Sequence, residues 1–207
     1  MFLYQSVDLQ GDDKAIALQS IDTLKTITCD QDLIPRIQQM NLIPELIQMI
    51  INSIGTIQNF EYMEFVNDFI ATYKDILNDQ IVMVAQAVVN RTRNEILSPS
   101  SNNHSLLVQK CMNILKQCTQ NKALMLRYSD QFEEIYKPIF EFMVDPTKIE
   151  IEDDILVIIK NFIKKTSKVS DTIFTVFPCM HNVFVKNKHA FGDSLMDTLN
   201  YYMIFGK

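Results

Sequence analysis

The chain has 207 residues, of which 47% are hydrophobic and 21% charged, and it carries a net charge of −6. It contains only 4 Gly and 6 Pro, which argues against β-sandwiches and barrels, because those folds need turn residues every few positions. The acidic balance argues against a nucleic-acid partner, since phosphate binding calls for a face rich in Lys and Arg. Long helices are therefore the first expectation.

Apolar residues recur at helical spacing along the first half of the chain. The first predicted helix covers residues 13–28, and Asn41 is predicted to cap a second helix that carries Pro44 in its first turn. A fourth helix is predicted over residues 81–97. The third is predicted from a stripe at steps of 3, 4, 4 and 3, formed by Tyr62, Phe65, Phe69, Tyr73 and Ile76.

The second half repeats this style after a loop predicted at residues 98–104. Pro138 is predicted to kink a helix that ends at Asp145-Pro146-Thr147. Gly192 and Asp193 are predicted to precede the last helix. The whole pattern predicts eight or nine helices and no strand.

A duplicated unit is the most informative feature of the sequence. Leu24-Lys25 and Leu115-Lys116 align 91 residues apart, and each is followed by an apolar helix that carries a proline, Pro44 or Pro138. A period near 90 equals two helical hairpins of the HEAT type, about 40–47 residues each. We therefore predict an all-α fold, a HEAT-like α-solenoid of antiparallel helix pairs. It would form one array over residues 1–207, with halves at 12–97 and 105–207.

The motifs that carry chemistry are missing. The sequence has no Gly-rich phosphate loop, no nucleophile elbow and no metalloprotease helix. Its one Cys/His cluster, Cys179, His181 and His189, lacks the spacing of a zinc site. We therefore expect a protein without catalytic activity, cofactor or metal. The longest apolar run is too short to span a bilayer, so no membrane insertion is expected either.

Two charged runs and a set of phenylalanines are candidate binding features. The acidic run has two interpretations: a first helical turn in which carboxylates are favoured by the helix macrodipole, or an acidic patch that binds a basic partner. It consists of Glu150, Glu152, Asp153 and Asp154. The basic run that follows is interpreted as the solvated end of the same helix and consists of Lys160, Lys164, Lys165 and Lys168. Most phenylalanines of the second half are predicted to be core, with a minority lining grooves between helices.

Three segments of the second half are similar to a known family. Residues 150–162, 169–180 and 190–202 resemble the middle-to-late HEAT repeats of nuclear transport receptors of the importin-beta superfamily, with importin seven/eight as the nearest branch. Residues 105–145 resemble the repeat before them, and residues 14–77 show a weaker likeness.

The resemblance implies a protein-binding segment of a nuclear import receptor, or karyopherin, that carries cargo through nuclear pores. The implied partners are protein cargo, Phe-Gly nucleoporins and Ran-GTP, and the implied location is the cytoplasm and nucleus, including the pore. Receptors of this family are several times longer, and their Ran contacts normally lie in N-terminal repeats. We therefore expect an excerpt of such a receptor, in which Ran contact belongs to other repeats. The alternative is a HEAT/armadillo scaffold of a cytosolic complex.

Overall fold

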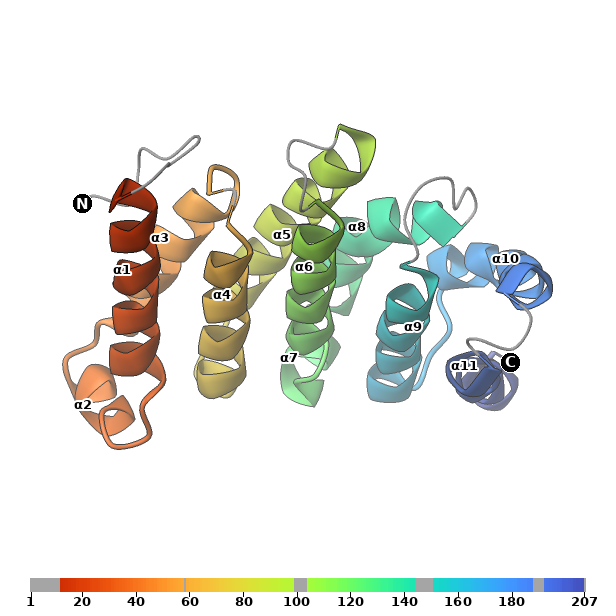
Figure 1. The fold of residues 1–207 in the computed structure, drawn as a ribbon. Coiled ribbons are helices and arrows are strands. Elements are labelled where there is room, and N and C mark those ends of the chain that lie inside the picture. Colours follow the sequence, from red (N-terminus) through yellow and green to blue (C-terminus); the bar gives the residue numbers. More distant parts are fainter. Residues whose placement is uncertain (1–11, 58, 99–103, 144–150, 188–191, 207) are drawn as a thin grey trace. The chain divides into compact units, whose positions relative to one another are not determined.

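The computed structural model describes residues 12–57, 59–98, 104–143, 151–187 and 192–206. Within these ranges the chain forms eleven α-helices and one short 3-10 helix and has no strand (Figure 1). The all-helical prediction is thus confirmed for the described residues. The chain divides into two compact units, Met1–Gln117 and Cys118–Lys207.

Unit 1 is built in two layers of helices. Figure 1 shows α1, α4 and α6 side by side in one layer, with α3 and α5 behind them. Helix α1 packs against α4, and α3 packs against α5. The helices of this unit are α1 (Asp12–Cys29), α2 (Ile34–Gln39), α3 (Ile43–Ile54), α4 (Phe60–Tyr73), α5 (Gln80–Leu97) and α6 (His104–Cys118).

Helix α4 has no exposed residue, unlike the other long helices of unit 1. Its N-cap is Asn59, whose Oδ1 accepts a hydrogen bond of 3.0 Å from the backbone N–H of Tyr62. Half of its residues are buried, which are Tyr62, Met63, Phe65, Val66, Phe69, Ile70 and Tyr73. The aromatic stripe predicted for this helix is therefore core, because neighbouring helices cover α4 on more than one side.

Unit 2 is organised around α9, which packs against α7, α8 and α11. Helix α10 in turn packs against α8 and η1. The elements of this unit are α7 (Lys122–Arg127), α8 (Ser129–Phe140), η1 (Glu141–Met143), α9 (Glu152–Thr166), α10 (Asp171–Asn187) and α11 (Gly192–Phe205). Pro138 lies within the last turn of α8, directly before the backbone changes to the 3-10 helix η1.

The order of helix lengths recurs along the chain. Helices α1 to α4 have 18, 6, 12 and 14 residues, and α6 to α9 have 15, 6, 12 and 15. The twelve-residue helices α3 and α8 are the ones that carry Pro44 and Pro138. The fold is thus repeat-like, as the duplicated sequence unit predicts. A continuous solenoid over both units stays a prediction.

The structure differs from the sequence prediction at several element boundaries. Helices α2 and α7 were not expected, because six residues are too short to show a periodic pattern. The prediction of Asn41 as an N-cap is wrong: its φ is 53°, and Leu42 caps α3 instead. Asparagine tolerates this left-handed conformation better than most residues do. Ile76 lies beyond the end of α4 and is exposed.

Other sequence predictions fall on segments outside the described ranges. These are the predicted helix end at Asp145-Pro146-Thr147 and most of the predicted loop at 98–104. In the part of the chain that is described, none of the helices combines the length and the apolar character needed to cross a bilayer.

Removal of the Tyr73 hydroxyl tests how α4 is joined to α1. This hydroxyl donates a buried hydrogen bond of 2.6 Å to the backbone carbonyl of Thr28. We expect Tyr73→Phe to lower the free energy of unfolding by about 1–2 kcal/mol, because the buried carbonyl loses its partner. Urea denaturation measures the change. Tyr201→Phe, on half-buried Tyr201, is the control and should stay within about 0.5 kcal/mol of the wild type; equal losses in the two variants would contradict the assignment.

Candidate functional site: charged and aromatic surfaces

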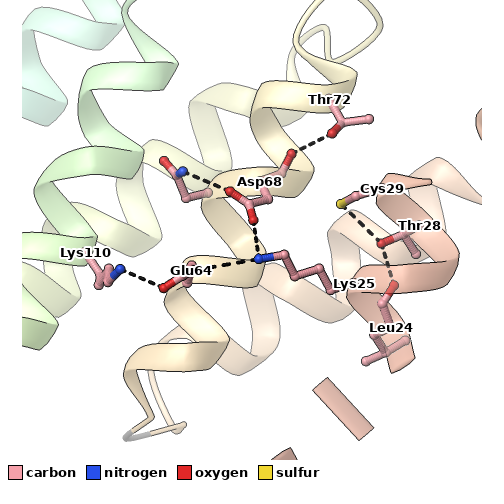
Figure 2. A network of polar contacts seen from close by, with 9 residues as sticks. Leu24, Lys25, Thr28, Cys29, Glu64, Asp68, Thr72 and Lys110 are labelled. Carbon is pink, nitrogen blue, oxygen red and sulfur yellow. Dashed lines mark hydrogen bonds and ion pairs between the residues drawn. The ribbon is translucent and has the colours of Figure 1, made fainter. Parts of the chain in front are cut away.

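Four charged side chains join three helices of unit 1 into what we term the charged ladder, which consists of Lys25, Glu64, Asp68 and Lys110. They come from α1, α4 and α6 (Figure 2). Glu64 and Asp68 lie four residues apart on the side of α4 that its buried stripe leaves free. Carboxylates at this spacing share one helix face.

The contacts of the ladder run from α1 through α4 to α6. Lys25 Nζ lies 2.7 Å from Asp68 Oδ2 and 3.7 Å from Glu64 Oε1. On the other side of α4, Lys110 Nζ lies 2.7 Å from Glu64 Oε2. Figure 2 shows Glu64 between the two lysines. All four side chains are partly exposed, so water and salt screen these ion pairs.

The ion pairs shift the acid–base equilibria of the ladder. The hydrogen bond from Lys110 lowers the pKa of Glu64, with further lowering by the nearby charges of Lys110 and Lys25, against a smaller opposing effect of burial. The hydrogen bond to Asp68 raises the pKa of Lys25. Both shifts favour the charged forms, the carboxylate of Glu64 and the ammonium of Lys25.

The charged ladder is suited to holding helices together and to contacting a partner more than to catalysing a reaction. Each carboxylate of the ladder already has an ammonium partner. Among the described residues there is no group of three His, Cys, Asp or Glu side chains that could hold a metal ion. The ladder therefore presents fixed, alternating charge on a surface of unit 1 that a partner protein can contact.

The predicted acidic patch lies at the start of α9 and differs from the expectation. Glu152 and Asp154 are only 2% and 8% exposed, and Asp153 is half-buried. Glu150 lies outside the described residues. Helix α9 packs against α7, α8, α11 and η1, and such contacts between distant segments have no signature in the local sequence. Partner binding through these residues stays a prediction, with Asp153 the most accessible carboxylate of the three described.

Two phenylalanines on α10 form an exposed aromatic pair. Phe174 is 57% and Phe177 is 40% exposed, and no other aromatic side chain whose burial is described is exposed to this degree. Their rings are stacked, with centroids 6.2 Å apart and planes 8° apart. Phe177 also contacts Tyr202 of α11 at a centroid distance of 5.0 Å.

Four of the other phenylalanines singled out in the sequence have described side chains, and two do not. Phe132, Phe140 and Phe162 are buried, and Phe142 is half-buried. The environments of Phe184 and Phe191 lie outside what the structure describes. Of the six with described side chains, three are thus buried, one is half-buried and two are exposed. That any of them lines a groove between helices stays a prediction.

Protonation of Glu64 provides a pH test of the ladder. The folded-state pKa of Glu64 lies below its ordinary value of 4.5, so its ion pair stabilises the fold above that pH. This contribution is lost as the pH falls through the folded-state pKa. Glu64→Gln should therefore cost up to about 1 kcal/mol at pH 7, since the pair is partly exposed, and little once the pH has fallen through the folded-state pKa of Glu64. Chemical denaturation as a function of pH measures this, with Glu61→Gln as control; a cost independent of pH would contradict the assignment.

No protein-family model, curated protein or solved structure matches this chain. The family resemblance read from the sequence therefore stays a prediction. Any function has to be argued from the charged ladder, the aromatic pair and the repeat-like order of the helices.

Proposed function

We propose that this chain is a protein-binding module of the HEAT-like solenoid kind and that it binds its partners without catalysing a reaction. Helices that bury their apolar stripes only against sequence neighbours leave long solvent-facing rows for partners. Support comes from the recurring order of helix lengths and from the layer of α1, α4 and α6 in unit 1. The partner class follows from the exposed side chains.

The exposed pair Phe174 and Phe177 carries the proposal. Large apolar side chains left in water mark sites where another molecule covers them, and aromatic rings gain most from a flat apolar partner. A short peptide that contributes a phenylalanine between flexible glycines fits a small surface of this kind. We accordingly assign the pair to Phe-Gly nucleoporin segments, in line with the resemblance to import receptors.

In this proposal the chain is part of a karyopherin that carries protein cargo through nuclear pores and moves between cytoplasm and nucleus. Contact with Ran-GTP is assigned to other repeats of such a receptor. The charged ladder is available to cargo with a complementary charge pattern. The alternative is a HEAT/armadillo scaffold in a cytosolic complex, which would show no affinity for Phe-Gly peptides.

Binding to an immobilised Phe-Gly repeat peptide tests this function. We expect the wild type to be retained and the variant with Phe174→Ala and Phe177→Ala to bind about tenfold more weakly, because two aromatic contacts are lost. The matched control is the variant with Met83→Ala and Leu106→Ala, which shortens two exposed apolar side chains of unit 1. Surface plasmon resonance measures the affinities.

Circular dichroism of each variant checks that it is folded. If the double variant is unstable, the single variant Phe174→Ala is used in the binding measurement instead. Failure of the wild type to bind the Phe-Gly peptide would exclude the transport function proposed for this chain and leave the scaffold. Equal losses in the Phe174/Phe177 variant and its control would remove the aromatic pair from the binding site.

A further inference from the structure

The solvent-facing side chains of α9 change from negatively charged at the start of the helix to positively charged at its end. Its outward positions recur at steps of four, three and four residues, and they are Asp153, Val157, Lys160 and Lys164. The row begins with a carboxylate and ends in two ammonium groups, and Lys168 follows just after the helix. Lys164 and Lys168 are exposed, and the adjacent Lys165 is half-buried.

The lysines at the end of this row differ in their partners. Lys160 Nζ lies 3.3 Å from Asp197 Oδ2 of α11. For Lys164, Lys165 and Lys168, by contrast, no carboxylate of the described chain lies within ion-pair distance. Unpaired charge therefore accumulates locally in a chain whose net charge is −6.

Helix α7 adds a fourth lysine at the same end of unit 2. Asn161 Nδ2 of α9 donates a hydrogen bond of 3.0 Å to Thr119 Oγ1, one turn before Lys122. Lys122 is the first residue of α7, is exposed, and has no ion pair with a described residue. Because α7 packs against α9, the lysines come from two elements held together. We term Lys122, Lys164, Lys165 and Lys168 the lysine surface.

The helix macrodipole accounts for only part of this surface. Lys164 and Lys165 stand in the last turn of α9, where a positive charge is favourable. Lys168 lies beyond the helix, after Ser167 in the left-handed conformation. Lys122 stands at a helix N-terminus, where a positive charge is unfavourable. The macrodipole therefore does not account for the charge of these two residues.

We propose that the lysine surface binds a short acidic segment of a partner protein, rich in Asp and Glu. A nucleic acid is less suited, because the basic row is short: at about 1.5 Å per residue, it gives way to Asp153 within a few helical turns. Exposed ammonium groups on flexible stems adapt to carboxylates of varied spacing. This site is separate from the aromatic pair and goes beyond the function proposed above.

Fluorescence anisotropy with a labelled oligo-glutamate peptide tests the proposal. The wild type is expected to bind, with an affinity that falls as salt is raised. The variant with Lys164→Gln, Lys165→Gln and Lys168→Gln is expected to bind about tenfold more weakly. The control with Arg36→Gln, Arg93→Gln and Lys137→Gln removes the same charge from exposed positions elsewhere. It should bind within about twofold of the wild type.

Each contrary outcome overturns the proposal. If the wild type does not bind the oligo-glutamate peptide in a salt-sensitive manner, the proposal is wrong, whatever the variants show. Equal weakening in the two triple variants would show that only the net charge matters. Tighter binding of a single-stranded RNA or of anionic lipid vesicles than of the peptide would assign the lysines to a different class of partner. Phe-Gly binding measured on the same variants should be unchanged, which separates this site from the aromatic pair.

Discussion

The fold of unit 1 depends on the burial of α4. Helix α4 has seven buried side chains, packs against α1, and is joined by ion pairs to α1 before it and to α6 after it in the chain. Burying one large apolar side chain contributes roughly 1.5–3 kcal/mol. No single neighbour could cover a helix that is apolar over so much of its circumference. Stacking of further helices is therefore required, and the layered arrangement in Figure 1 follows from it.

The same constraint decides where binding can occur. Side chains that face a neighbouring helix are buried in the core. Partner binding is therefore confined to the narrow rows of side chains that face solvent. In unit 1 such a row holds the charged ladder, whose charges are mutually paired. In unit 2 the rows hold an exposed aromatic pair and a set of lysines without ion pairs among the described residues. The paired charges fix helices to one another and present a set charge pattern, whereas the lysines without ion pairs can form new ones with a partner.

Local periodicity was sufficient to predict the long helices, and the stripe from Tyr62 to Tyr73 is buried as expected. Short helices such as α2 and α7 were missed because six residues hold less than two turns. The prediction of Asn41 as an N-cap was wrong because asparagine is common both at helix N-caps and in left-handed turns, and Asn41 adopts the left-handed conformation. The ladder pairs Lys25 with Asp68 and Lys110 with Glu64 across different helices, a relation that depends on packing and has no local signature. The burial of Glu152 was not predicted for the same reason, because it depends on how α9 packs against other helices.

The four cysteines differ in ways that matter for labelling. Burial raises the pKa of Cys111 and Cys118 to about 12, so their thiolate, the reactive form, is nearly absent at neutral pH. Cys29 and Cys179 are only half-buried, and one lies in each unit. Maleimide dyes should therefore select these two natural thiols, giving a donor and acceptor pair for energy transfer between the units without engineered substitutions.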